Sequence, residues 1–351
     1  MKYSSLHITN FRSIVELKID NFKRINLITG RNNCGKTTVL EALFQISGMS
    51  NPNLPVTVNN IRDLVLTSDD NLRFIFHNLD FKQKPYISAI LDGNKRDLVI
   101  KPKYSSQYNK TLVNDNKINV FNDNVIATSN NEFSVVNGLS LEFNDERYNK
   151  KFISEISLSG GAVKIDAQYR ENLKCSFHAP QFYMSMFPQR IEQLLVNKQM
   201  DGVISSLNEI DNSITDIRIG TAGILYVDIG LNKLLPLNIM GDGIRRILSI
   251  LAAVSDMRGG ILLIDEIETG LHYSSLETLW KSLLRASDLY DVQLFITTHS
   301  TECIRALSAI LEKDSDAVCL YRIERDENTH RAFEYPSDMV AACVEDNIEM
   351  R

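Results

Sequence analysis

Hydrophobic positions follow three successive patterns along the chain, and the first covers its N-terminal end. Three short strands are predicted where residues alternate or run apolar, at 3–8, 14–19 and 25–29. A helical pattern then begins at Lys36, and Pro52 and Pro55 break it.

The second pattern, between residues 56 and 175, consists of short apolar runs separated by Asn, Asp, Gly and Lys. Such separators form turns, so an antiparallel β insertion is predicted, with room for one helix. The runs interpreted as strands are IRDLVLT, LRFIFHNLDF, YISAIL, RDLVIK, FSVVNGLSLEF and AVKIDAQY. Asn is abundant in residues 109–149, where we expect a flexible arm or loop, and the absence of long heptads argues against a coiled coil.

The third pattern starts at residue 189, where helical segments alternate with buried strands. These strands are predicted at 261–264, 293–297 and 317–323. The alternation indicates an α/β fold with a parallel sheet covered by helices. We expect one domain over residues 1–351, made of an N-terminal part (1–50), a β-rich lobe (51–178), a helical lobe with further strands (179–335) and a tail (336–351).

Composition narrows the class of protein. Of the residues, 44% are hydrophobic and 23% are charged, as in an ordinary soluble globular protein. The formal net charge of -6 leaves no global basic field to steer the chain onto nucleic acid. Five widely spaced cysteines predict neither disulfides nor a zinc site, and favour a cytoplasmic location. With no signal core or membrane-length run, any membrane role would belong to another chain.

The stretch GRNNCGKTT, residues 30–38, lies between a strand pattern and a helical pattern. It fits G-x-x-x-x-G-K-[ST], in which glycines let backbone N–H groups turn towards phosphate. Lys36 would reach the β- and γ-phosphates of ATP, and the Thr37 hydroxyl would bind Mg²⁺. Cys34 occupies a free position, where a small filler is favoured over a redox role. The expected nucleotide contacts here are Gly30, Asn32, Asn33, Cys34, Gly35, Lys36, Thr37 and Thr38.

Two other strand ends carry candidate catalytic side chains. ILLIDE would deliver Asp265 to Mg²⁺ and Glu266 to the attacking water as a general base. QLFITTHS ends a second buried strand at His299, which would hydrogen-bond the γ-phosphate at the sheet edge where α/β proteins bind ligands. The predicted metal ligands are Thr37 and Asp265, and the predicted catalytic residues are Lys36, Glu266 and His299.

A further motif, NIMGDGIRRILSILAAV, begins an amphipathic helix. The shared apolar face consists of Ile244, Ile247, Leu248, Leu251 and Val254. Before it, Gly241, Asp242 and Gly243 would expose several backbone N–H groups, either to a ligand or as a plain helix cap. The motif alone leaves both interpretations open.

In their order, ITNFRSI, GRNNCGKTT, MGDGIRR, LLIDEIETGLH and TTHS resemble the motifs of ABC-type ATPase heads of the SMC and RecF kind. The chain most closely resembles stand-alone "AAA family" ATPases related to the OLD (overcoming lysogenization defect) proteins. Those include ATPase subunits of the anti-phage systems PARIS, Septu and Gabija. The resemblance covers roughly residues 1–48 and 180–330. It implies a P-loop NTPase of ABC-ATPase head type, with a mixed sheet flanked by helices and an antiparallel β-rich insertion.

The resemblance also assigns roles within one subunit. GRNNCGKTT would be Walker A, Asp265 and Glu266 would be Walker B, and His299 would be the switch histidine. Phe11 and Arg12, in NFRS, would lie near the nucleotide. Either Gln181 or Gln189 would be the Q-loop residue.

Between subunits, the resemblance implies a homodimer or higher oligomer that encloses ATP. MGDGIRR would replace the ABC signature, so that Gly241, Asp242 and Gly243 touch ATP bound by the second subunit. EIETGLH would form a loop that crosses the interface.

The departures from the family's relatives narrow the function. The MGDGIRR motif differs from LSGGQ, the ABC signature, which argues against a transporter subunit. The sequence contains no long helical arms, which argues against an SMC-type tether. No TOPRIM-like cluster of metal-binding acids follows the head, so we expect no nuclease in this chain. The effector, a nuclease or toxin encoded nearby, would then be a partner.

Three functions remain to be compared. The favoured one is a Mg-dependent ATPase that dimerises around ATP and controls that effector in anti-phage defence. The alternative is a RecF/SMC-like ATPase that clamps DNA, for which the best basic patch is Lys95, Arg96, Lys101 and Lys103; a solvated hairpin is the preferred interpretation of that stretch. A protein that uses ATP only for structure is disfavoured, since binding needs no base such as Glu266.

Overall fold

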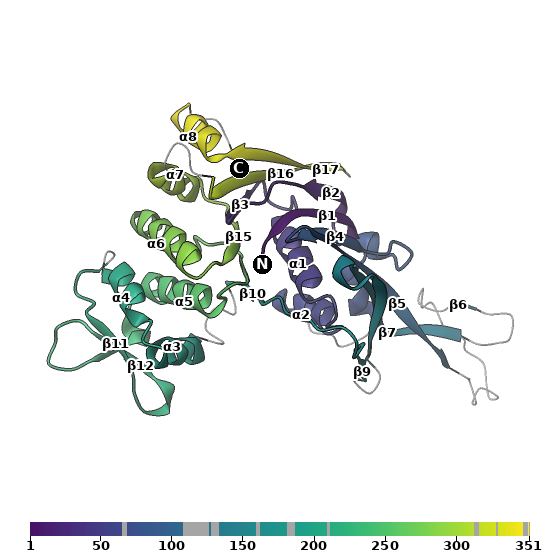
Figure 1. Cartoon of the computed structure of the whole chain (residues 1–351), viewed down its shortest axis with the longest axis horizontal. Helices are drawn as coiled ribbons and strands as arrows, with labels where there is room; N and C mark the ends of the chain where they lie inside the picture. Colours follow the sequence, from purple (N-terminus) through teal and green to yellow (C-terminus); the bar gives the residue numbers. More distant parts are fainter. Residues whose placement is uncertain are drawn as a thin grey trace, which may run out of the picture.

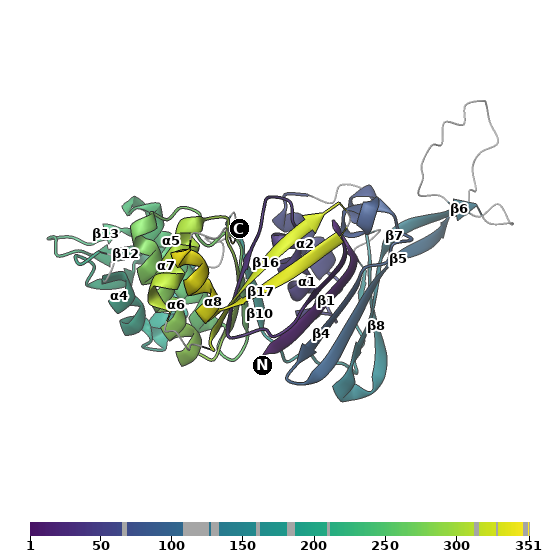
Figure 2. The same ribbon diagram turned by 90° about the horizontal axis from the view of Figure 1, so that it is seen from above.

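Two large sheets share the chain, and the first is antiparallel. The computed structural model describes residues 1–64, 69–107, 126–127, 133–158, 162–180, 187–208, 211–311, 316–327, 329–346 and 350. The antiparallel sheet contains β1 (Tyr3–Phe11), β2 (Ile14–Ile19), β4 (Tyr86–Leu91), β5 (Asn94–Gln107), β6 (Ile126–Ala127), β7 (Phe133–Asp145), β8 (Lys150–Ser157) and β9 (Val163–Lys164). Its order is β2-β1-β4-β5-β7-β8-β9, with β6 beside β7. The strands of the predicted β-rich lobe therefore continue the sheet that the N-terminal strands begin (Figure 2).

The second sheet is mixed and has the order β10-β14-β15-β3-β16-β17. Its strands are β3 (Ile25–Thr29), β10 (Cys175–His178), β14 (Ile261–Ile264), β15 (Gln293–Thr297), β16 (Val318–Asp326) and β17 (Thr329–Pro336). All neighbours are parallel except β16 and β17. Every residue of β3, β14 and β15 is buried, as expected for central parallel strands covered on both faces. The strands predicted around 25–29, 261–264, 293–297 and 317–323 are confirmed.

Helices cover both faces of the mixed sheet (Figure 1). The helices are α1 (Lys36–Ser47), α2 (Leu54–Ile61), α3 (Phe187–Val196), α4 (Met200–Asn208), α5 (Asp242–Asp256), α6 (Leu276–Leu289), α7 (Thr301–Ile310) and α8 (Ser337–Glu345). A small third sheet, β11 (Asp216–Ile219), β12 (Leu225–Asp228) and β13 (Leu235–Pro236), lies beside α3 and α4. None of these helices, in the part of the chain that is described, is both long and apolar enough to cross a membrane.

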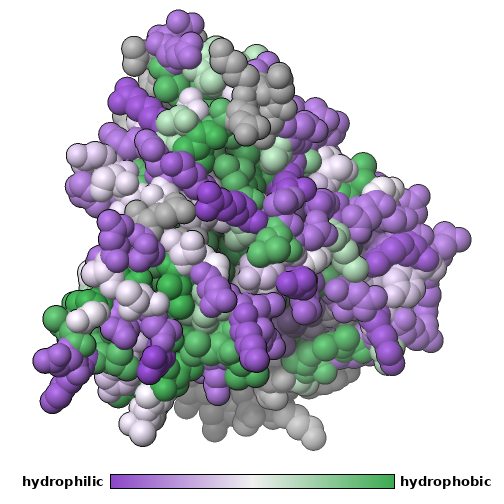
Figure 3. Space-filling model, turned by 60° about the vertical axis from the view of Figure 1, so that its left-hand side comes forward, coloured by the Kyte–Doolittle hydropathy of each residue, from purple (hydrophilic) through white to green (hydrophobic). Residues whose placement is uncertain are grey.

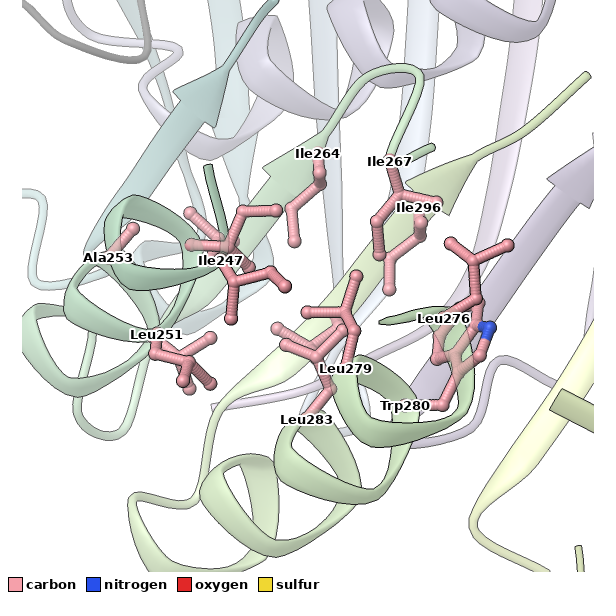
Figure 4. Close-up of a cluster of buried hydrophobic side chains, with 14 of the residues drawn as sticks. Ile247, Leu251, Ala253, Ile264, Ile267, Leu276, Leu279, Trp280, Leu283 and Ile296 are labelled. Atoms are coloured by element: carbon pink, nitrogen blue, oxygen red, sulfur yellow. The ribbon is translucent and has the colours of Figure 1, made fainter. Parts of the chain in front are cut away.

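Two hydrophobic cores result from this layering. One core lies between the mixed sheet and α5, α6 and α7, where Ile247, Ile264, Leu279, Trp280 and Ile296 converge (Figure 4). The other lies between the two large sheets and contains α1. Alternate residues of β14 point to opposite cores, which fixes the strand between its helical layers. The predicted α/β fold with a mixed sheet is confirmed, whereas the internal divisions of the chain stay predictions.

Several predictions for residues 56 to 175 are wrong. Residues 54–61 are α2, and the run predicted as a strand at 72–81 instead holds two 3₁₀ helices, η1 (Asp69–Ile75) and η2 (His77–Leu79). The fully buried side chains there are Leu72, Ile75 and Phe76, which are spaced three and four apart as in a helix. Residues 65–67, the rest of the first predicted strand, lie outside the described residues.

Other strand predictions were incomplete. The run AVKIDAQY contributes only β9, and β8, with its alternating KKFISEIS sequence, was not predicted. The strand predicted from FSVVNGLSLEF is confirmed as β7, so the arm or loop expected in the Asn-rich segment does not include residues 133–145; residues 108–125 and 128–132 lie outside the described residues.

The candidate basic patch is neutralised by acidic partners. Arg96 was expected on an exposed hairpin but is fully buried, because it pairs with Asp145 and Glu171. The other members pair on the surface, namely Lys95 with Asp97, Lys101 with Glu142 and Lys103 with Glu155. Figure 3 shows a different face, the left-hand side of Figure 1, on which hydrophilic and hydrophobic residues are mixed.

Candidate nucleotide-binding site

The candidate site lies where β3, β14 and β15 end, at their carboxyl edge. These strands are parallel neighbours, so the loops that follow them must meet. The loops are residues 30–35, 265–272 and 298–300. A cavity of about 1130 Å³ opens between them. It is lined by Arg12, Ser13, Asn32, Asn33, Gly35, Lys36, Thr37, Thr38, Arg62, Leu64, Phe74, Phe76, His77, Asn78, Leu79, Glu266, Glu268, His299 and Arg325.

The loop before α1 has a backbone that requires glycine. Gly30 and Gly35 have φ of 137° and 102°, and Asn33 between them has φ of 61°. A Cβ at Gly30 would lie 2.3 Å from the carbonyl oxygen of Ile323, so no side chain fits there. The chain thus curls tightly and leads straight into the N-terminus of α1.

Lys36 points back into this loop. Its Nζ donates to the carbonyl oxygens of Gly30 and Arg31, at 2.7 and 2.9 Å. Burial lowers the pKa of Lys36. Among the described residues, no carboxylate lies within ion-pair distance of this ammonium group, so an anion in the cavity would supply its missing counter-charge.

Cys34 is a buried filler of the same loop. Its Sγ lies 3.9 Å from the Nζ of Lys36, and burial raises the pKa of the thiol. A raised thiol pKa opposes the reactive thiolate form, which argues against a redox role. Its side chain lines a second cavity of about 490 Å³ on the other side of the loop, rather than the larger one.

Asp265 and Thr37 meet as the sequence predicts. The Thr37 hydroxyl lies 3.1 Å from both carboxylate oxygens of Asp265, and the Thr297 hydroxyl donates to one of them at 2.6 Å. Burial raises the pKa of Asp265, and the hydrogen bonds from the two hydroxyls offset only part of this rise. A buried carboxylate beside a threonine hydroxyl is a set of hard oxygen donors that fits a small divalent cation.

Glu266 occupies a strained backbone position. Its φ of 48° is unusual for a residue with a side chain, and its N–H donates to the Thr297 hydroxyl at 2.8 Å. The carboxylate accepts a hydrogen bond from Thr269 at 3.1 Å. His299 Nε2 lies 4.0 Å from the other oxygen, and both side chains are partly exposed to the cavity.

Glu268 joins the loops that follow β14 and β15, and this contact was not predicted. One carboxylate oxygen accepts from the backbone N–H of His299 at 2.6 Å, and the other accepts from the Thr298 hydroxyl at 2.8 Å. These bonds hold the histidine loop against the loop after β14. The EIETGLH motif drew attention to this loop but not to this carboxylate.

Arg12 lies in the cavity wall, but its guanidinium is already occupied. It pairs with Glu41 at 2.7 Å and donates to Asn59 at 3.0 Å and to the carbonyl oxygen of Phe74. Arg62, which was not predicted, pairs with the other oxygen of Glu41 at 2.6 Å. We call Arg12, Glu41 and Arg62 the cavity ion cluster. Its members come from three separate segments, so no local motif reveals it.

The Gly241–Gly243 motif lies outside this cavity. Gly241 and Asp242 are exposed at the start of α5, and Asp242 pairs with Arg245. A Cβ at Gly243 would lie 3.6 Å from the carbonyl oxygen of Gly270, so the motif borders the loop after β14. The structure therefore does not bring Gly241, Asp242 and Gly243 to the phosphate loop of their own subunit.

The structure does not decide between the two candidates for the Q-loop residue. Gln189 is exposed on α3 and does not line the cavity. Gln181 lies outside the described residues. The choice between them stays open.

Comparisons with known proteins agree with this geometry. The family model described as "AAA domain, putative AbiEii toxin, Type IV TA system" matches residues 25–305. An "ATP/GTP phosphatase" of Helicobacter pylori is 30% identical over 343 residues, which cover 88% of this chain and 89% of that protein.

Two further similarities, one in sequence and one in structure, are more limited. "DNA replication and repair protein RecF" of Clostridium acetobutylicum is 33% identical over 103 residues, 28% of this chain and 27% of that protein. The solved structure "Crystal structure of the SmcHead bound to the C-winged helix domain of ScpA" has a TM-score of 0.52 and 8% identity, and the match covers 96% of this chain and 98% of that chain. The latter shows a shared fold of the ABC-ATPase head type.

Proposed function

The chain belongs to the AAA-domain family whose model matches it, and with this premise we propose that it is a Mg²⁺-dependent ATPase whose two subunits enclose ATP. Membership of this P-loop ATPase family is shown by the match over residues 25–305. The residue roles, the dimer and the biological task are the proposal. One observation carries it: Lys36, Glu266 and His299 face a single cavity, with Thr37 joined to Asp265 at its base.

The phosphate loop fits the triphosphate of ATP. Glycine conformations at Gly30 and Gly35 keep the loop free of side chains, and α1 presents its N-terminus. Lys36, held by two carbonyl oxygens and the Sγ of Cys34, would exchange these weak partners for phosphate oxygens. The name of the Helicobacter pylori relative, "ATP/GTP phosphatase", supports a nucleoside triphosphate as substrate.

Thr37 and Asp265 would hold Mg²⁺. When bound, Mg²⁺ would supply positive charge that polarises the phosphate oxygens. The two residues themselves provide a hydroxyl and a carboxylate, and burial of that carboxylate away from water raises its pKa. A divalent cation is the natural compensation for such a group.

Glu266 is the proposed general base. Its carboxylate would accept a proton from a water molecule as the water oxygen bonds to the γ-phosphorus. The bond from that phosphorus to the bridging oxygen breaks, which yields ADP and phosphate. His299 lies 4.0 Å from Glu266 and would hydrogen-bond the γ-phosphate, while Glu268 fixes the histidine backbone.

Dimerisation explains why the Gly241–Gly243 motif is exposed rather than in the cavity. We infer that it contacts ATP held by the phosphate loop of the partner. Arg246, one turn into α5, donates to the carbonyl oxygens of Asp265 and Glu266 at 3.3 and 3.4 Å. A nucleotide that draws the start of α5 towards the partner would therefore act directly on the backbone of the catalytic loop.

The cellular task proposed for this ATPase is control of a partner effector, a nuclease or toxin, in anti-phage defence. It is supported by the resemblance of the motifs to OLD-related defence ATPases. ATP would favour the closed dimer, and hydrolysis would release it, because the γ-phosphate contacts exist only in the closed state.

A DNA clamp is the second candidate, favoured by the RecF relative and the SMC-like fold. It predicts steeply salt-dependent DNA binding through unpaired surface cations. The patch around Lys101 and Lys103 does not provide them, because both ammonium groups already pair with carboxylates. We therefore prefer the effector-controlling ATPase.

Steady-state hydrolysis of Mg-ATP tests the proposal. Glu266→Gln should lower kcat by about 10²–10⁴-fold because the general base is lost. Glu277→Gln, the same change on the exposed first turn of α6, should leave kcat unchanged. Equal kcat values for Glu266→Gln and wild type would refute the assignment of the base.

A further inference from the structure

The strand β16 runs past the end of its neighbour and alongside the phosphate loop. β16 pairs with β3 as far as Arg322, opposite Thr29, and then continues to Asp326 while β3 ends. The extension touches the loop, since the carbonyl oxygen of Ile323 occupies the space where Gly30 has no side chain. Figure 2 shows this β16–β17 hairpin extending from the mixed sheet towards β1.

Arg325 lies on the extension and reaches both sides of the phosphate loop. It lines the large cavity together with Asn32, Asn33 and Lys36, and it also lines the smaller cavity behind the loop. Its cross-strand partner is His330, whose ring lies 3.8 Å from the Cβ position of Gly35. Directly opposed residues share one face of a hairpin, so this face is turned towards the loop.

Arg325 differs from the other arginines of the cavity in its ion pairing. Arg12 and Arg62 share the carboxylate of Glu41. Arg325 is exposed, and its Nε donates to the carbonyl oxygen of Glu327 at 3.1 Å. Within the described ranges, no carboxylate pairs with it.

We propose that Arg325 binds the terminal phosphate groups of the nucleotide in this cavity. The inference rests on the proposed ATP site and adds to it a residue from a distant part of the sequence. A guanidinium presents a planar fork of N–H donors that matches two phosphate oxygens, and it stays charged at any working pH. Arg325 and Lys36, which both line the large cavity, would then hold the phosphates together.

Nucleotide binding measured by titration calorimetry tests this role. The Glu266→Gln variant serves as background, so that ATP remains intact, and Arg325→Ala is added to it. We expect the Kd for Mg-ATP to rise about tenfold, as for loss of a charge-assisted hydrogen bond. The Kd for Mg-ADP should rise less, and the Kd for AMP should not change.

Arg331→Ala is the matched control. Arg331 lies one position along the same hairpin, opposite Glu324, and therefore on the other face. Its removal changes the net charge equally and should leave every Kd unchanged. Arg325→Lys should recover part of the ATP affinity, because a charge remains.

The outcomes separate this inference from the proposed function. An unchanged Kd for ATP in Arg325→Ala, or equal losses for ATP, ADP and AMP, would overturn the role in phosphate binding. If the Glu266→Gln background itself bound no ATP, or if Lys36→Ala did not weaken binding in that background, the ATP site itself would be refuted.

Discussion

Two ion clusters among the described residues pair guanidinium groups with buried carboxylates, and they differ in their charge balance. The cavity ion cluster has two guanidinium groups, Arg12 and Arg62, on one carboxylate, Glu41. Arg12 and Arg62 form part of the wall of the candidate nucleotide cavity. One positive charge is left over, at a place where an anion can approach.

The second cluster, in the antiparallel sheet, is balanced. Arg96 and Arg147 face the carboxylates of Asp145 and Glu171, and the Tyr169 hydroxyl lies 2.8 Å from Arg96. Arg96 and Asp145 are fully buried. We call this set the sheet ion cluster.

The comparison shows that burial of charge alone does not mark a functional site. The sheet ion cluster balances two guanidinium groups with two carboxylates and joins β5 to β7, so its net charge calls for no ligand. The cavity ion cluster has one carboxylate for two guanidinium groups, and one of these, Arg62, is exposed beside the cavity. An unbalanced cluster beside a cavity is the stronger indication of a binding site.

The largest expected effect comes from breaking the balanced cluster. Arg96→Met removes the guanidinium partner of Glu171 and a second cation beside the buried Asp145, so the free energy of unfolding should fall by about 3–5 kcal/mol. Urea unfolding followed by circular dichroism measures the change. Lys95→Met, an exposed neighbour on the same strand, should change it by less than about 0.5 kcal/mol.

Loss of the sheet ion cluster should not change how much bound nucleotide stabilises the protein. In Arg96→Met, Mg-ATP should add the same free energy of unfolding as in wild type. A loss of ATP stabilisation in the folded variant would mean that the two clusters are coupled, contrary to the comparison.

A smaller effect is expected from Glu41→Gln, which removes the single carboxylate of the cavity ion cluster. Without ligand, stability should fall by about 1–3 kcal/mol, because Arg12 loses a charged partner while Arg62 can reach solvent. Mg-ATP should then stabilise this variant more than wild type, since phosphate would relieve the uncompensated cations. Thermal unfolding with and without Mg-ATP measures both quantities.

Glu171→Gln in the sheet ion cluster is the matched comparison for Glu41→Gln. It removes one negative charge from a cluster that faces no nucleotide, so the increment from Mg-ATP should equal that of wild type. An equal increment in both variants would contradict the view that the cavity ion cluster is the one open to an anion.

The same contrast explains what the sequence could predict. The phosphate loop, the acidic pair and His299 are local motifs that follow apolar strands, and their meeting at one sheet edge follows from parallel order. Glu41, Arg62 and Arg325 become neighbours of the site only through the packing of distant segments. Which of all these residues touch nucleotide stays a prediction.

Some of the missed structure did leave a signal in the sequence. The spacing of Leu72, Ile75 and Phe76 is helical, but the aromatic and β-branched content of the run suggested a strand. The sequence carries no signal for the position of Arg325, because a charged residue near a turn normally indicates a solvated strand end. Its position depends on β16 being longer than β3, which only the three-dimensional register reveals.

The most direct test of the ATP-enclosing dimer is the light-scattering mass of Glu266→Gln, measured with and without Mg-ATP and compared with wild type. If two subunits enclose ATP, Mg-ATP should double the mass of Glu266→Gln. Wild type should show the doubling only transiently, and Lys36→Ala should abolish it. A mass that does not depend on nucleotide would contradict the ATP-enclosing dimer.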